Sequence, residues 1–177
     1  YTFVGNDLVG SQVIPYEINV GTVSLSIGMD AGWNWFSINV AGDDMSPDAV
    51  LANLEPEYND QIKSQGPFAV YIGEINGVDY GWSGNLTEID PTSMYMINIS
   101  NGGTLDYAGV PTNPSTTPIS LGIGWNWIGY LPQGDMAINE ALGTVEALYD
   151  DQIKSQSAFA TYLGVINGVD YGWSGSL

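Results

Sequence analysis

Apolar and polar side chains alternate with a period of two over several short segments of the chain. Trp33 and Trp35 stand on either side of Asn34, and Met94–Ile99 has a strand-like pattern. Successive side chains of a β-strand point to opposite faces of the sheet, so each segment is expected to be a strand with two different faces. Both tryptophan rings of the first segment then lie on one side of the strand.

A short helix is expected near residues 47–54. Ser46 suits the N-cap position, Pro47 suits the first helical position, and Asp48 places an acid in the first turn. The counterpart segment at about 135–148 has no proline, and we expect its helix to run longer. The predicted fold class is mainly β, made of β-sheets with one or two short helices per unit.

The dipeptide Asn76-Gly77 between β-branched residues predicts a two-residue hairpin loop, because a type I′ turn needs positive φ at both positions. The loop fixes the register, with three facing pairs: Ile75 with Val78, Gly73 with Tyr80, and Tyr71 with Trp82. One face of the hairpin then carries Tyr71, Tyr80 and Trp82, and the other carries Phe68, Val70 and Ile72. We also expect the Tyr80 ring to lie over Gly73.

The chain carries the same sequence pattern twice. Three segments recur in the same order: Gly32–Trp35 as Gly124–Trp127, Gln61–Gln65 as Gln152–Gln156, and Ile75–Gly84 as Ile166–Gly175. The last of these recurs letter for letter. The spacing suits a small domain rather than a solenoid repeat, so two tandem pseudo-symmetric repeats of about 90 residues are predicted.

The repeat divides the chain into four expected parts: an N-terminal strand segment at 1–20, repeat unit 1 at 21–110, a Pro/Thr linker at 111–118, and repeat unit 2 at 119–177. Unit 1 continues into Met94–Ile99, whereas unit 2 lacks this final strand. Tyr1–Val4 has the alternation of such a strand. We hypothesise that it either closes a preceding unit or substitutes for the strand that unit 2 lacks, and contacts of residues 1–6 with neither unit would argue against both.

The charge and the missing residue types limit the function. The chain has 2 Lys and Arg residues, 20 Asp and Glu residues, a formal net charge of −18, no His and no Cys. Such a surface repels polyphosphates, so no nucleic acid partner is expected. Disulfides, thiol nucleophiles and histidine proton shuttles are excluded. No run of about 18 apolar residues occurs and Tyr1–Val4 lacks a basic start, so neither membrane insertion nor a signal peptide is expected within the chain.

No enzyme is expected. Ser83 and Ser174, in Gly-Trp-Ser-Gly, have no histidine to activate them. Asp79 with a second carboxylate would satisfy the chemistry of glycoside hydrolysis, but two small units offer little cleft. The acid clusters make Asp43, Asp44 and Asp135 weak calcium candidates. Since no D-x-[DN]-x-[DN]-G loop occurs, a solvated acidic face is favoured and no other cofactor is expected.

The repeated aromatic residues are the main candidate site, together with one repeated lysine. The set comprises Trp33, Trp35, Tyr71, Tyr80, Trp82 and Lys63 in unit 1, and Trp125, Trp127, Tyr162, Tyr171, Trp173 and Lys154 in unit 2. Flat rings stack on the apolar faces of sugars while polar neighbours bond to hydroxyls. The alternative is that the rings form the core of a small β unit, since each buries a large area. Ring exposure distinguishes the two.

Lys63 and Lys154 are the only cations and occupy equivalent positions. One interpretation packs the lysine stem on an aromatic ring while the ammonium pairs with Asp60 or another acid. A second makes the lysine a hydrogen-bond donor to a sugar. A third is an intramolecular Lys–Asn isopeptide crosslink, for which Asn34 and Asn126 are the first residues to consider.

The succession of Gly-Trp-Asn-Trp, Gln-Ile-Lys-Ser-Gln and Tyr-Gly-Trp-Ser-Gly in both units resembles a Trp-rich tandem module of large secreted or surface proteins of bacteria, Bacteroidetes-like ones especially. The resemblance implies an extracellular or cell-surface, non-catalytic accessory role. The function expected is an extracellular module that binds carbohydrate through repeated Trp and Tyr faces. The alternative is a structural or adhesive repeat of a long surface protein, with neighbouring repeats as partners.

Overall fold

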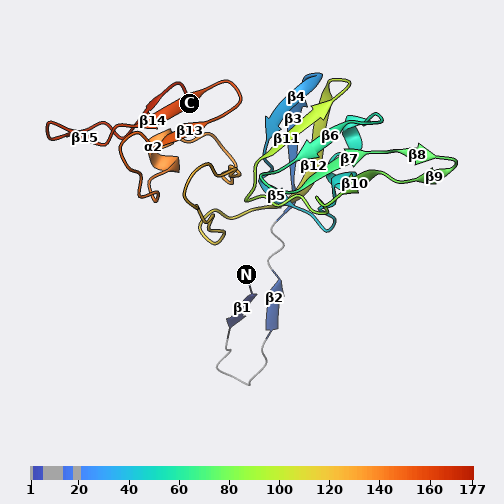
Figure 1. Ribbon diagram of the computed structural model, residues 1–177. Helices are drawn as coiled ribbons and strands as arrows, with labels where there is room; N and C mark the ends of the chain where they lie inside the picture. Colours follow the sequence, from blue (N-terminus) through green and yellow to red (C-terminus); the bar gives the residue numbers. More distant parts are fainter. Residues whose placement is uncertain (1, 6–13, 18–20) are drawn as a thin grey trace.

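A computed structural model describes residues 2–5, 14–17 and 21–177 of the chain. Strands make up 37% of it and helices 7%, with several antiparallel sheets, so the mainly β prediction is confirmed. Two parts lie side by side in Figure 1, one built from the strands of unit 1 and one from those of unit 2. None of the helices in the described residues is long and apolar enough to cross a membrane.

Two antiparallel sheets form most of unit 1, beside the two-stranded sheet of its hairpin. The larger has the order β10 (Trp82–Gly84), β7 (Phe68–Tyr71), β6 (Gln61–Lys63), β11 (Tyr95–Ile99) and β4 (Gly32–Phe36). The smaller has the order β3 (Val23–Met29), β12 (Gly103–Pro111) and β5 (Val40–Ala41). The predicted strand near Met94–Ile99 is therefore confirmed as β11, and it lies inside the larger sheet rather than at its edge.

The core of unit 1 includes one face of the larger sheet. Tyr95, Ile97 and Ile99 of β11 are buried, while Met96 and Asn98 between them are only half-buried. Ile62 and Ala69 of the neighbouring strands and Leu105 of the smaller sheet belong to the same core cluster, and none of the three is exposed. Burying an aliphatic side chain in this way stabilises the fold by about 1.5–3 kcal/mol.

Both predicted helices exist, and both are short. α1 spans Pro47–Val50, begins where predicted, and is capped by the Ser46 hydroxyl, which accepts from the Ala49 amide at 3.3 Å. A 3-10 turn, η1, continues it over Ala52–Leu54. The expectation of a longer second helix is wrong, since α2 spans Ile138–Ala141. Gly143 and two β-branched residues follow soon after, and all three disfavour helix.

The hairpin of unit 1 has the predicted register. β8 (Glu74–Ile75) pairs with β9 (Val78–Asp79), and Tyr71 faces Trp82. Asn76 and Gly77 have φ values of 53° and 80°, as a type I′ loop requires. The aromatic ring next to Gly73 is not Tyr80 as predicted, but Tyr71. Its edge would lie 3.2 Å from a Cβ placed on Gly73, because Gly73 itself has a φ of 64° and turns the strand.

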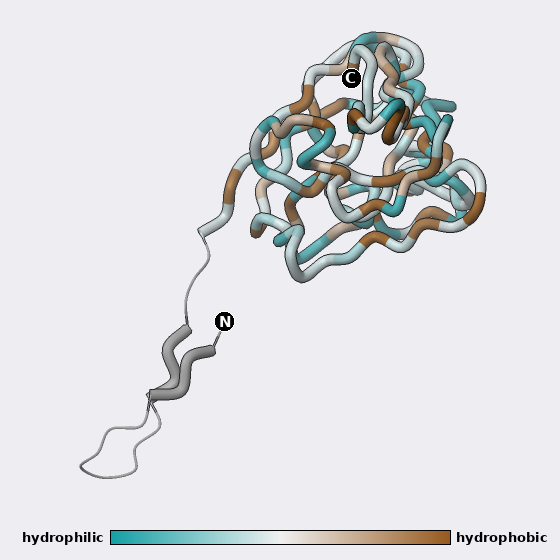
Figure 2. Tube along the Cα trace, turned by 90° about the vertical axis from the view of Figure 1, so that its left-hand side faces the viewer, coloured by the Kyte–Doolittle hydropathy of each residue, from teal (hydrophilic) through white to brown (hydrophobic). Residues whose placement is uncertain are grey.

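The second half of unit 2 repeats these elements. A sheet of β13 (Gln152–Lys154), β14 (Phe159–Tyr162) and β17 (Trp173–Gly175) is accompanied by a hairpin of β15 (Val165–Ile166) and β16 (Val169–Asp170). The counterpart of β4 does not form a strand, and the one bridge there joins Ile128 to Ser93 of unit 1. Figure 2 shows hydrophobic stretches that reach the outer loops of the molecule.

The N-terminal segment forms a strand pair of its own. β1 (Thr2–Gly5) is antiparallel to β2 (Ile14–Glu17). Among the described strands, neither is hydrogen-bonded to a strand of unit 1 or unit 2. Tyr1 and residue 6, which were part of the hypothesis about the closing strand, lie outside the described residues.

Candidate functional site

The larger sheet of unit 1 has an inner face toward the core and an outer face. Direct cross-strand partners share a face, and Lys63 is opposite both Met96 and Phe68, while Met96 is also opposite Trp35. Trp33 belongs to the same side because it lies two positions from Trp35 in β4. We call these five residues the outer face of unit 1.

Trp33 and Lys63 are in contact on this outer face. The lysine Nζ lies 4.7 Å from the centroid of the Trp33 ring, a cation–π distance. Trp33 remains 42% exposed and Phe68 54% exposed. The lysine belongs to β6, which β11 separates from β4, so the contact spans the intervening strand.

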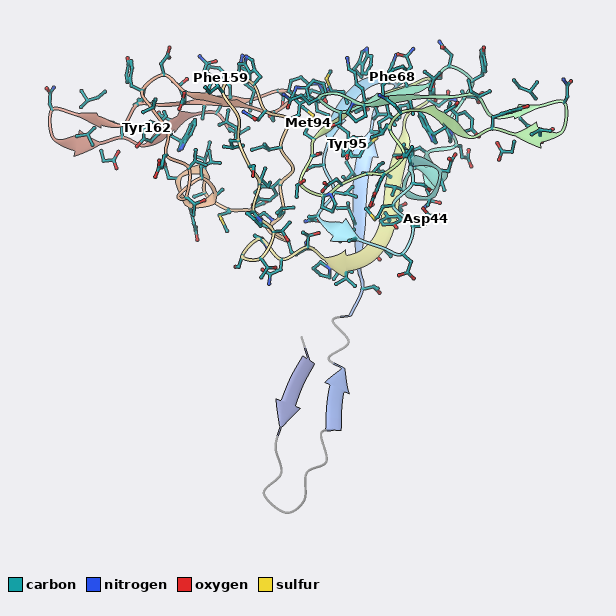
Figure 3. The ribbon with its side chains drawn as sticks, turned by 60° about the horizontal axis from the view of Figure 1, so that its bottom comes forward. Asp44, Phe68, Met94, Tyr95, Phe159 and Tyr162 are labelled. Atoms are coloured by element: carbon teal, nitrogen blue, oxygen red, sulfur yellow. The ribbon has the colours of Figure 1, made fainter. Side chains whose placement is uncertain are left out.

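Unit 2 presents counterparts of three of these side chains, Trp33, Lys63 and Phe68. Lys154 Nζ lies 4.8 Å from the Trp125 ring centroid, Trp125 is 59% exposed, and Phe159 is 54% exposed. Figure 3 shows Phe68 and Phe159 on the same upper side of the molecule, with Met94 between them. The two groups therefore lie on one side of the protein.

The remaining predicted site residues are divided between core and solvent. Trp82 packs edge-on against Tyr71 at 5.4 Å, and Trp173 packs against Tyr162 at the same distance. Both tryptophans are 8% exposed, so these pairs serve packing. Tyr80 and Tyr171, in contrast, are more than half exposed and directly follow the hairpin strands β9 and β16.

The lysines do not pair with the acid suggested by the sequence. The Asp60 carboxylate is buried and accepts from the Ser100 amide at 2.9 Å and the Ser100 hydroxyl at 2.7 Å. Its other oxygen accepts from the Glu57 amide at 2.9 Å. The contact with Trp33 supports the interpretation that the lysine packs on an aromatic ring. The predicted ion pair between the lysine and Asp60 is wrong.

The geometry does not bring either lysine to the asparagine considered for a crosslink. Asn34 alternates with Trp33 in β4, so its side chain is on the opposite side of the sheet from Lys63. Its amide donates to the carbonyls of Asp30 and Gly32, at 2.6 and 3.0 Å. Asn126 makes the corresponding bonds to Gly122 and Gly124. These asparagines hold turns.

Two glutamines that were not among the predicted site residues join the units. Gln156 donates to the Trp33 carbonyl at 3.0 Å and accepts from the Trp35 amide at 2.7 Å. Gln65 makes the reciprocal bonds, to the Trp125 carbonyl at 2.8 Å and from the Trp127 amide at 2.9 Å. The signal in the sequence was the recurrence of the second Gln in Gln-Ile-Lys-Ser-Gln.

The acids considered for calcium do not gather around a common point. Asp44 accepts from the Ser46 amide at 2.9 Å, and the hydrogen bonds from Ser46 lower the pKa of its carboxyl. Among the residues that the structure describes, no group of three carboxylates lies close enough to hold a metal ion. Asp44 therefore accepts a hydrogen bond within its own loop, and Asp135 is exposed to solvent.

Comparison of the chain with known protein families, with curated proteins and with solved structures gave no match. The class defined by the fold is that of mainly β proteins. Within it, the site is an open surface of two exposed Trp–Lys pairs rather than an enclosed pocket.

Proposed function

We propose that the chain is a non-catalytic, extracellular or cell-surface module that binds carbohydrate through the outer face of each unit. The observation that carries the proposal is the pair of exposed rings, Trp33 and Trp125, each with a lysine ammonium over its ring. A flat ring offers apolar area to the C–H face of a sugar. Ammonium and amide groups beside it can bond to the hydroxyls.

Polar side chains of the outer face support this interpretation. Asn98 of β11 is opposite both Trp33 and Gln61, so two amides lie in the same row as the exposed tryptophan. Both amides are half-buried, which limits their motion. Phe68 offers a second exposed ring in the neighbouring row. A ligand that lies across the strands from β4 to β7 contacts an aromatic ring at each end and the two amide groups between them.

The charge of the chain favours a neutral ligand. With a formal net charge of −18, the surface repels sulfated sugars and uronic acids at ordinary ionic strength. Lys63 and Lys154 are already engaged with rings and supply one hydrogen-bond donor group per face. We therefore expect neutral oligosaccharides to bind better than acidic ones.

The test is a screen of neutral oligosaccharides followed by calorimetry on variants. We expect Trp33→Ala combined with Trp125→Ala to weaken binding about tenfold or more, since about 1.4 kcal/mol of lost contact is a factor of ten. Trp33→Ala alone should cost more than Trp125→Ala, because the unit 1 face has Asn98 beside its ring and unit 2 has no counterpart of β11 among the described strands.

Two tyrosines provide a matched control. Tyr58 and Tyr149 occupy equivalent positions, are 72% and 73% exposed, and lie in the loops before β6 and β13. Their replacement by Ala should leave binding unchanged. No binding by any neutral oligosaccharide, or equal binding by the double tryptophan variant and the original chain, would overturn the proposal.

A second candidate is a structural or adhesive repeat of a long surface protein. The observation that favours it is the reciprocal contact of Gln65 and Gln156 with the other unit, which joins the repeats through their own side chains. Under this alternative the exposed tryptophans bind no sugar. The calorimetric comparison above therefore separates the two candidates.

A further inference from the structure

The two units differ at one strand edge. In unit 1, β6 is hydrogen-bonded to β7 on one side and to β11 on the other. In unit 2, the equivalent strand β13 pairs with β14 alone, and its second edge has no strand partner in the described part of the chain. An open edge of this kind is a template for a further strand.

The backbone groups at the open edge can be identified. At the two ends of β13, the Tyr162 amide donates to the Asp151 carbonyl and the Ser155 amide donates to the Ala158 carbonyl. Alternate residues of a strand bond in opposite directions. The backbone groups of Gln152 and Lys154 therefore face the open edge, as those of Gln61 and Lys63 face β11 in unit 1.

Two side chains that contact β11 or the residue before it in unit 1 have equivalents without such a partner in unit 2. Ile62 is opposite Ile97 of β11 and is fully buried, whereas Ile153 is only half-buried. The hydroxyl of Ser64 donates to the Met94 carbonyl at 3.0 Å. That of Ser155 instead turns back to Ala158, from whose amide it accepts at 3.1 Å.

The carboxylates show the same difference. Asp60 uses one oxygen for the Glu57 amide and the other for Ser100, directly after β11. Asp151 uses one oxygen for the Leu148 amide at 2.7 Å and is otherwise exposed to solvent. A shallow hollow of about 310 Å³ lies over β13 and the turn that joins it to β14, and its lining includes Gln152, Lys154 and Phe159.

We propose that the open edge of β13 accepts an extended segment of a partner protein, which adds to the sheet as β11 does in unit 1. The partner segment has the alternation of β11, with apolar side chains at the positions of Tyr95, Ile97 and Ile99 and a serine at that of Ser100. Backbone hydrogen bonds supply affinity and the alternate side chains supply specificity. The partner segment extends the sheet of β13, β14 and β17 by one strand, in the way that β11 pairs with β6 in unit 1.

The test uses the whole chain, labelled for NMR, and a synthetic peptide with the sequence of residues 93–102, flanked by lysines for solubility. We expect saturable binding that slows hydrogen exchange of the Gln152 and Lys154 amides about tenfold or more. The amides of Gln61 and Lys63, which β11 already covers, act as the internal control and should not change.

Variants of the peptide avoid any question of folding. Ile97→Asp in the peptide should weaken binding at least about tenfold, since this side chain is fully buried in unit 1. Ser100→Ala should weaken it about tenfold, because the hydroxyl hydrogen bond to a carboxylate is lost while the backbone amide keeps its own. A peptide of scrambled sequence with the same lysines should not bind.

Two outcomes would overturn the proposal. One is unchanged exchange at Gln152 and Lys154 at saturating peptide, or equal slowing by the scrambled peptide. The other is protection of these amides without peptide that rises with protein concentration, which would assign the edge to a second copy of this chain. Neither outcome bears on sugar binding at Trp33, so the two proposals fail independently.

Discussion

Asp48 and Asn139 show how two different residues can serve one structural role. Asp48 of α1 accepts a hydrogen bond from the Trp82 amide at 2.9 Å, and Asn139 of α2 accepts one from the Trp173 amide at 2.7 Å. Both bonds end on Oδ1, the atom that the two side chains share. The sequence did not reveal this pair, because the two equivalent positions hold different residue types, Asp and Asn.

Replacing Asp48 tests the role of that oxygen. Asp48→Ala leaves the amide of a buried tryptophan without a partner, so we expect a loss of about 1–3 kcal/mol in the free energy of unfolding. Asp48→Asn keeps the oxygen and should change it by less than about 1 kcal/mol. Urea unfolding followed by tryptophan fluorescence measures both. Equal losses in the two variants would show that charge, rather than the acceptor, matters.

Tyr95 gives the stability of the chain a pH dependence in the alkaline range. Burial raises the pKa of its hydroxyl, and the charges of Asp90 and Glu88 act in the same direction. The unfolded chain therefore loses this proton at lower pH than the folded chain. The resulting contribution to the free energy of unfolding is constant below the ordinary tyrosine pKa of about 10 and decreases as the pH rises above it.

Urea unfolding at about pH 8 and about pH 10.5 checks this expectation. The decrease between the two should be smaller in Tyr95→Phe, although Tyr71, Tyr107 and Tyr130, whose pKa values are also raised by burial, keep part of it. Tyr58 is exposed, so Tyr58→Phe is the control and should retain the full decrease. An equal decrease in Tyr95→Phe and the original chain would contradict the assignment.

At the scale of elements, the turn and register of the hairpin could be predicted from the sequence, whereas the buried face of its strands could not. The Asn76-Gly77 loop sets the hairpin register through its own φ preferences, and this register is confirmed. The sequence left open which face of the hairpin strands looks inward. That choice depends on the smaller sheet, whose strands β3 and β12 come from opposite ends of unit 1. The contacts of Gln65 and Gln156 could not be predicted for a similar reason, because their partners lie 60 and 123 residues away in the sequence.

Gly81, which lies between strands β9 and β10, is a position where only glycine fits. Its φ is 49°, and an added Cβ would overlap the Asp48 carboxylate that holds the Trp82 amide. We expect Gly81→Ala to lower the free energy of unfolding by about 2–4 kcal/mol, through backbone strain and displacement of Asp48. Urea unfolding measures the loss.

Gly66 provides the matched control for this substitution. It lies in the exposed turn between β6 and β7, and no atom outside its chain neighbours lies near the place of an added Cβ. Gly66→Ala should be neutral or slightly stabilising, by at most about 1 kcal/mol. Equal effects at the two positions would show that the crowding at Gly81 is relieved without cost.

At the scale of the whole molecule, two glutamine side chains hold the units together. Each amide group offers one donor and one acceptor to a strand edge, as a peptide unit would. Further bonds near them join Asn39 to Pro132 and Gln133, at 2.8 Å each, and Ser37 to the Tyr130 amide at 3.1 Å. Side-chain hydrogen bonds thus join the units at several points.

Hydrogen exchange tests this contact. The Trp35 amide is bonded to Gln156, so Gln156→Ala should accelerate its exchange about tenfold or more, and Gln65→Ala should do the same for Trp127. The Ile97 amide inside the sheet of unit 1 serves as the reference and should not change. Unchanged exchange at Trp35 in the Gln156→Ala variant would mean that other bonds hold the units in place.

The reciprocal form of the glutamine contact limits how such units can assemble. Each unit gives one glutamine and receives one on its Trp-Asn-Trp segment, so the glutamine contact is isologous and complete with two members. A head-to-tail contact would propagate along an array, whereas this one closes on itself. Units that meet through it are therefore expected to group in pairs, with a different kind of contact between one pair and the next.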